Sequence, residues 1–87
     1  MERLLHLRVL TPAKTVLEAE TGSVRLPLTD GLAGILPGHA PMLCALSAGE
    51  LRCSVDGKTV RIRLSGGVAH VGSDLLTVLT PEAETVS

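Results

Sequence analysis

The apolar residues of this chain come in short runs that glycine, proline or aspartate interrupts every few positions, and this pattern most limits how the chain can fold. Within a run, hydrophobic side chains recur at every second position, as Leu5, Leu7 and Val9 do. That period is typical of a β-strand with one buried face. No window shows a convincing helical period. The sequence predicts an all-β fold, a small antiparallel β-sandwich or flattened barrel of about nine to ten short strands.

The interruptions define the expected strands and turns. Asp56 and Gly57 form the clearest hairpin signal, because this pair suits the positive φ angles of a two-residue turn. Residues 47–50 are expected to turn the chain, and residues 65–67 to break it. Strands are expected over residues 4–10, 15–19, 23–28, 34–36, 41–46, 51–55, 59–64, 68–71 and 75–79.

Length and composition narrow the class of protein. The 87 residues suit one domain, which we expect over residues 1–80, with residues 81–87 as a polar tail. The absence of Phe, Tyr and Trp removes any platform on which bases could stack. A net charge of −1 gives no strong attraction to nucleic acid or anionic lipid. The apolar runs are too short to span a bilayer and the N-terminus does not resemble a signal peptide. We expect a cytoplasmic protein, or one held at a membrane only through partners.

The two cysteines, Cys44 and Cys53, are expected to be reduced in a cytosolic chain. If residues 47–50 close a four-residue loop, Leu46 lies opposite Leu51 and Cys44 opposite Cys53. This register predicts two neighbouring free thiols, because directly opposed Cβ atoms are somewhat too far apart for a disulfide. Two thiols and three dispersed histidines do not make a zinc site. We predict no metal and no cofactor.

Residues 30–43 differ from the rest, since they combine three glycines, two prolines and one histidine with many apolar side chains. Gly34, Pro37, Gly38 and Pro41 are expected to shape a loop, because glycine permits unusual φ angles and proline fixes φ. The apolar side chains here are too many to point into so small a core: Leu32, Ala33, Ile35, Leu36, Met42 and Leu43. An exposed apolar patch generally marks a protein interface.

His39 is the first candidate for a catalytic residue. Catalysis would need a nucleophile or carboxylate within hydrogen-bond reach, and nothing in the sequence holds Asp30 against His39. The glycines lack the lysine and following helix of a phosphate-binding loop. Ser65 lacks the strand-turn-helix context of a nucleophile elbow. We therefore expect the His39 ring to bond to backbone or to meet a partner. A small ligand-binding or hydrolytic β-barrel that uses His39 and the glycine-rich loop stays open as the alternative.

Residues 31–41 closely resemble the signature loop of a known family. Gly31 and Gly34 are followed by Ile-Leu-Pro-Gly-His-Ala-Pro, as in the epsilon subunit of F-type ATP synthases, which is called delta in mitochondria. Further matches occur in the same order along the chain, and the likeness covers its whole length. These matches lie at residues 7–12, 46–49, 51–52, 64–67 and 78–80.

The resemblance implies a ten-stranded N-terminal β-sandwich that performs no chemistry. It implies a central-stalk rotor subunit of a proton- or sodium-translocating ATP synthase, which couples the gamma subunit to the membrane ring of c subunits. Such a subunit lies peripherally at the cytoplasmic face of the inner (plasma) membrane. The positions that match the family's ring contact are Asp30, Gly31, Leu32 and Ala33, and those that match its gamma contact are Thr11, His39, Ala40 and Cys44. An uncovered apolar surface is also compatible with a weak homodimer of the isolated chain.

The chain departs from the family pattern in three ways. The family continues into a two-helix C-terminal domain, which can inhibit ATP hydrolysis and in some bacteria binds ATP. This sequence ends at Ser87, where those helices would begin, so we expect either that the domain was cut away or that this version lacks it, and neither property is carried over. Leu32 replaces an acidic residue of many relatives, which predicts a more apolar ring contact. Cys44 replaces a common threonine at the position that faces gamma.

Overall fold

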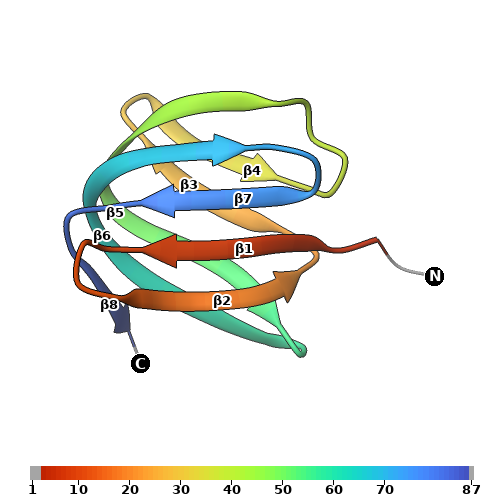
Figure 1. Ribbon diagram of the computed structural model, residues 1–87, viewed down its shortest axis with the longest axis horizontal. Helices are drawn as coiled ribbons and strands as arrows, with labels where there is room; N and C mark the ends of the chain where they lie inside the picture. The colour runs from red at the N-terminus through yellow and green to blue at the C-terminus, as the bar shows by residue number, and fades with distance from the viewer. Residues whose placement is uncertain (1–2, 87) are drawn as a thin grey trace.

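One hydrogen-bonded sheet of eight strands runs through residues 3–86, the part of the chain that the computed structural model describes (Figure 1). The strands follow the order β2-β1-β7-β6-β5-β3-β4, and β8 pairs with β6. Their bounds are β1 Leu5–Leu10, β2 Thr15–Thr21, β3 Val24–Leu28, β4 Gly31–Ile35, β5 Met42–Val55, β6 Lys58–Val71, β7 Leu75–Leu79 and β8 Ala83–Val86.

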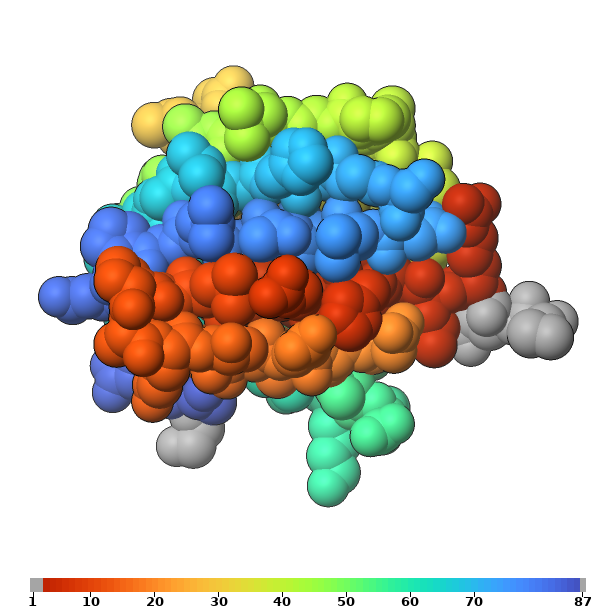
Figure 2. Space-filling view, in the orientation of Figure 1, coloured from red at the N-terminus to blue at the C-terminus, as the bar shows by residue number. Residues whose placement is uncertain are grey.

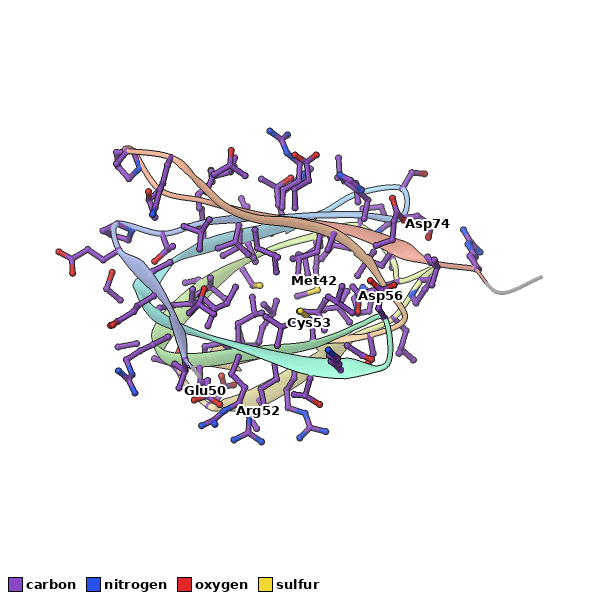
Figure 3. The ribbon with its side chains drawn as sticks, turned by 90° about the horizontal axis from the view of Figure 1, so that it is seen from below. Met42, Glu50, Arg52, Cys53, Asp56 and Asp74 are labelled. Carbon is purple, nitrogen blue, oxygen red and sulfur yellow. The ribbon has the colours of Figure 1, made fainter. Side chains whose placement is uncertain are left out.

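The sheet folds over itself into two layers because β5 and β6, of 14 residues each, pair along almost their whole length and bend together. Layer A contains β2, β1 and β7 with residues 67–71 of β6 and 42–46 of β5. Layer B contains β4, β3 and β8 with the remaining halves of β5 and β6. Figure 3 shows the two layers edge-on with side chains packed between them. The fold is the predicted all-β sandwich, and the sheet is not closed into a barrel.

The core lies between the layers and consists almost entirely of aliphatic side chains from both. The predicted alternation of Leu5, Leu7 and Val9 is confirmed, since all three are fully buried. Met42 and Cys53 also lie between the layers in Figure 3. The other largest fully buried hydrophobic residues are Val24, Leu26, Ile35, Leu51, Ile62, Val71, Leu76 and Val78.

Two hairpins agree with the sequence. β1 and β2 pair antiparallel on either side of the turn at residues 11–14. Asp56 and Gly57 join β5 to β6 with φ angles of 51° and 77°. Both angles are positive, as a two-residue turn that matches the twist of its strands requires.

The sequence predicted a turn at residues 47–50 and a break at residues 65–67, and both predictions are wrong. Residues 47–50 lie within β5 and residues 65–67 within β6, and the two segments face each other: Ala48 pairs with Ser65, and Leu46 with Gly67. This is the corner at which the strand pair passes from layer A to layer B. The buried face changes there from even to odd positions, since Leu46 and then Leu51 point inward along β5. The glycines and polar residues of these two segments therefore indicate a bend within each strand, where the sequence predicted that each strand would end.

Glycine makes the bend possible in β6. Gly66 and Gly67 have φ angles of 110° and 115°, which side chains rarely adopt. A Cβ on Gly67 would lie 2.0 Å from the carbonyl oxygen of Leu79. No real contact is that short, so only glycine lets β6 pass this close to the end of β7.

The predicted cysteine register is wrong because it assumed a loop at residues 47–50. Cys44 pairs with Ala69 and Cys53 with Val60, all within the long β5–β6 ladder. The two cysteines are therefore not opposite one another. Both are free thiols, as predicted, and burial raises the pKa of the Cys53 thiol.

The polar tail expected over residues 81–87 instead contains a strand. Ala83–Val86 forms β8, which pairs with β6 through partners such as Ile62 and Thr85. Glu82 anchors the entry to this strand, because its N–H donates to Ser65 Oγ at 2.9 Å and its carbonyl accepts from the Ser65 N–H at 3.1 Å. The described residues thus hold eight strands rather than nine to ten, and Ser87 lies outside them.

Gly67→Ala tests the corner. We expect a loss of about 3 kcal/mol or more in the free energy of unfolding, from the strained φ angle and the clash with Leu79. Gly34→Ala is the matched control, because Gly34 has no positive φ and nothing within 4 Å of an added Cβ. Urea unfolding followed by far-ultraviolet circular dichroism measures both. Equal stability of the two variants would show that the corner tolerates a side chain.

Candidate functional site

An apolar strip lies exposed on the outer face of layer A, the face that Figure 2 shows. Leu43, Val68 and Leu79 are 71%, 40% and 47% exposed. Val68 pairs with Leu79 on one side and Ala45 on the other, so the strip crosses three neighbouring strands. Side chains alternate along each strand, so these residues face outward because those beside them face the core. We call Leu43, Ala45, Val68 and Leu79 the apolar strip.

The strip ends in a shallow groove beside the corner. The groove combines the end of β1 and the following turn with parts of β6 and β7. Its lining is Leu10, Thr11, Pro12, Gly67, Val68, Leu79, Thr80 and Pro81. Thr11 closes the turn, since its N–H donates to the Lys14 carbonyl at 2.9 Å. The predicted gamma contact Thr11 therefore borders the apolar strip.

Charged side chains of β1 and β2 border the same face. His6 lies between two carboxylates, with Nδ1 2.8 Å from Glu20 and Nε2 2.9 Å from Glu18. Hydrogen bonds to Glu20 and then to Glu18 raise the pKa of His6. Both ring nitrogens can donate only in the protonated form. An apolar centre with a charged border is the usual anatomy of a protein–protein interface.

The loop before β5, at residues 36–41, is held in place by the turn between β6 and β7. Asp74, in the turn between β6 and β7, accepts the Gly38 N–H at 2.7 Å and the Arg3 Nε–H at 2.6 Å. The Arg3 guanidinium and then the Gly38 amide lower the pKa of Asp74. Gly38 has a φ of 83°, which favours glycine here. Nothing in the sequence indicated this contact, which joins residues 36 positions apart.

His39 bonds only to backbone among the described residues. Its Nδ1 donates to the Ala40 carbonyl at 2.7 Å, and its N–H donates to the Leu36 carbonyl at 3.1 Å. The prediction of a ring bonded to backbone is confirmed. No side chain of residues 3–86 lies in hydrogen-bond contact with the ring as a nucleophile or a base would.

The predicted ring contacts lie together at one end of the sandwich. Leu28 pairs with Gly31 across a two-residue turn, so Asp30 is at the tip of the β3–β4 hairpin. Gly31 has a φ of 132°, and Leu32 is 65% exposed, whereas Ala33 is half-buried. The hairpin lies beside the corner, and a shallow depression joins it to residues 47–50.

The predicted gamma contacts do not form one cluster. The turn after β1, which contains Thr11, lies at the corner end of layer A. The segment between β4 and β5, which contains His39 and Ala40, lies at the other end (Figure 1). Cys44 is half-buried and packs against the core, so its neighbour Leu43 faces outward instead. The exposed strip lies between the two ends. Gly34, expected to shape a loop, lies within β4 opposite Arg25, whereas Pro37, Gly38 and Pro41 do lie outside the strands.

The profile of the family described as "ATP synthase, Delta/Epsilon chain, beta-sandwich domain" matches residues 4–86. The chain belongs to this family. It is 46% identical over 80 residues to the ATP synthase epsilon chain of Synechococcus sp. and 48% identical over 83 residues to that of Prochlorococcus marinus. These matches cover 92% and 95% of this chain but 58% and 62% of the relatives. The chain thus spans less than two thirds of their length.

Solved structures with the same fold come from assembled ATP synthases. A chain of the Euglena gracilis mitochondrial ATP synthase, in a structure of OSCP/F1/c-ring, superposes with a TM-score of 0.88 at 25% identity over 94% of this chain and 53% of that chain. A chain from the Tetrahymena thermophila central stalk and c-ring superposes with a TM-score of 0.78 at 15% identity, which shows the fold alone.

The described residues contain no helix long and apolar enough to cross a membrane. Within the same residues, no three His, Cys, Asp or Glu side chains are grouped as a metal would require.

Asp74→Gly tests the hydrogen bond from the Gly38 N–H to Asp74, which holds the loop before β5. Glycine accepts the φ of 53° at this position but removes the carboxylate. We expect the Gly38 amide to exchange with solvent faster, by on the order of fivefold, because it loses its acceptor. Hydrogen exchange followed by NMR measures this. Asp56→Gly is the matched control, since Asp56 has a similar φ of 51° in the β5–β6 turn. A Gly38 amide as protected in Asp74→Gly as in the parent would contradict the role of Asp74.

His6→Gln tests the charged border through the pH dependence of stability. The pKa of His6 is raised in the folded state. Its stabilisation is therefore fully present below the unfolded value of about 6.5 and is lost as pH rises through the folded pKa. We expect the parent to exceed His6→Gln in melting temperature at pH 6 and to lose that advantage by pH 9. His70→Gln, on the same outer face, is the control. The same advantage at both pH values would argue against a charged His6.

Proposed function

We propose that this chain is the sandwich part of a non-catalytic central-stalk subunit that couples gamma to the membrane ring of c subunits in an F-type ATP synthase. The observation that carries the proposal is the apolar strip on layer A with its charged border, in a chain that belongs to the delta/epsilon family. A strip of this kind needs a protein partner to cover it. A sandwich held rigid by a dense aliphatic core suits a part that transmits torque.

Gamma is the partner that we assign to the outer face of layer A. Thr11 lies at one end of the apolar strip and His39 with Ala40 near the other, so a partner covering the strip reaches both. We assign a central contact to Leu43, because it is the most exposed large hydrophobic residue among residues 3–86. Cys44 supports the surface from the core side, since it packs inward at this strand.

The ring is the partner that we assign to the β3–β4 hairpin. Asp30, Gly31 and Leu32 are all exposed around its tip. Leu32 offers an apolar contact there, with 65% of its surface exposed. On this proposal the protein is peripheral, held at the cytoplasmic face of the membrane through the ring. A weak homodimer of the isolated chain would form through the same strip before gamma covers it.

Co-purification tests both assignments. The tagged chain is expressed with gamma and the c ring, and the recovered subunits are quantified. We expect Leu43→Asp to reduce the recovery of gamma about tenfold, because a charge in a desolvated contact is costly. Leu32→Asp is expected to reduce recovery of the ring while gamma is retained.

Thr59→Asp serves as the control, because Thr59 is exposed on the β5–β6 hairpin, away from both surfaces. Thermal unfolding of each isolated variant shows that the fold is kept. The proposal fails if the parent recovers neither partner, or if both leucine variants recover gamma and ring as well as the parent does.

A further inference from the structure

The outer face of layer B carries an arginine row that the proposed function does not use. Arg25 pairs with Arg52, and Arg52 pairs with Arg61, so three guanidinium-bearing residues lie side by side on β3, β5 and β6. Arg63 follows on the same face of β6, two residues after Arg61. Figure 3 shows Arg52 and Glu50 on the side of the molecule that faces away from β1 and β2.

This face is positive although the molecule is not. The outward positions of its strands hold four arginines and two glutamates, Glu50 and Glu84, which leaves a local charge of +2. The whole chain has 8 basic and 9 acidic residues and a net charge of −1. Half of the basic residues of the chain are therefore concentrated on one sheet face. Like charges directly opposite one another in a sheet are destabilising, so the row carries a cost within the isolated chain.

Glu50 offsets that cost at one end of the row only. It binds Arg61 through two bonds, Nε to Oε1 at 2.8 Å and Nη2 to Oε2 at 3.0 Å. It also accepts from Arg52 Nε at 2.8 Å. The Arg61 and Arg52 guanidiniums lower the pKa of Glu50 to about 2. This carboxylate shows the geometry in which the face binds an acidic group.

The other end of the row keeps unused donors. Within residues 3–86, Arg25 has no carboxylate within ion-pair distance. Arg52 uses only its Nε on Glu50, which leaves its two terminal nitrogens. Arg63 approaches Glu84 no closer than 4.0 Å. Arg25 and Arg52 therefore face solvent with donors free for carboxylates from outside.

A shallow depression includes these two arginines in its lining. It is lined by Ser23, Val24, Arg25, Gly34, Leu36, Arg52 and Cys53. Gly34 lies opposite Arg25 and leaves open space above β4, since nothing is within 4 Å of where its Cβ would be. Leu36 is 58% exposed at the edge of this depression. Guanidinium groups and an exposed leucine thus occur together on one surface.

We propose that this face is a docking surface for an acidic amphipathic helix of a partner protein, whose carboxylates bind Arg25 and Arg52 and whose apolar side chain packs on Leu36. Glutamates at positions i and i+4 lie on one face of a helix, with their Cβ atoms roughly 5–6 Å apart. Neighbouring strands are about 4.8 Å apart, so successive carboxylates match successive arginines. Arginine also favours carboxylates through paired, planar hydrogen bonds. This surface adjoins the hairpin assigned to the ring, since Arg25 and Arg52 also line the depression that reaches Leu32. The inference does not rest on the proposed function, because it is argued from the arginines and Leu36 alone.

The same observations disfavour other anions. The chain contains no aromatic residue to stack on a nucleotide base. The depression is open rather than enclosing, so the two guanidiniums are the main contacts that it offers to a small phosphate. The exposed leucine has no role with either ligand. A helix uses both the charges and the leucine.

The test measures binding of a fluorescein-labelled synthetic peptide of Glu, Leu and Ala, with glutamates at i and i+4, by fluorescence anisotropy at low salt. We expect saturable binding that weakens as salt rises. Arg25→Gln combined with Arg52→Gln should raise the Kd about fivefold or more. Leu36→Ser should also raise the Kd. Arg8→Gln combined with Lys14→Gln is the matched control, because it removes the same charge from β1 and the following turn.

Three comparisons complete the experiment. A peptide with Gln in place of Glu should not bind, and neither tripolyphosphate nor phosphatidylglycerol vesicles should bind as tightly as the acidic peptide. Thermal unfolding confirms that each variant is folded. The proposal is overturned if the acidic peptide does not bind, if both double variants weaken it equally, or if tripolyphosphate or vesicles bind more tightly. None of these measurements uses gamma or the ring, so a failure here leaves the co-purification result unaffected.

Discussion

The architecture depends on the close approach of Gly67 to the carbonyl of Leu79 at the corner. A side chain at this position would separate β6 from the end of β7. Because glycine is present, β6 can pair with β7 in layer A and continue into layer B without ending. One strand pair therefore belongs to both layers. A domain of 87 residues gains rigidity in this way, since no flexible loop joins the halves of β5 and β6.

The corner also decides which side chains face outward. The buried positions change parity as β5 and β6 pass through it, so Leu43 and Arg52 are both exposed although one position is odd and the other even. In layer A this leaves aliphatic residues on the outer face, bordered by charged residues of β1 and β2. In layer B it leaves arginines. The sandwich thus presents two outer faces of different chemistry, which suit different partners.

The loop at residues 36–41 is held by a contact far from it in sequence. Asp74 binds both Gly38 and Arg3, and so joins the loop, the turn after β6 and the start of the chain. Residues 30–43 extend from one end of the molecule to the other. Asp30 is at the hairpin tip beside the corner, and His39 is near Asp74. A single stretch of sequence therefore contributes to two separate surfaces.

The sequence by itself determined the fold class, the β1–β2 and β5–β6 hairpins and the inward faces of the regular strands. These depend on periods of two residues and on local turn chemistry, which involve near neighbours only. It could not distinguish a turn from a bend at residues 47–50 and 65–67, because the same residue types permit both. Only the tertiary structure decided that these segments pair, which side chains the parity change exposes, and that β8 joins the sheet. Each of those outcomes depends on contacts between residues far apart in the chain, where packing against β7 and β6 decides among conformations that are locally equivalent.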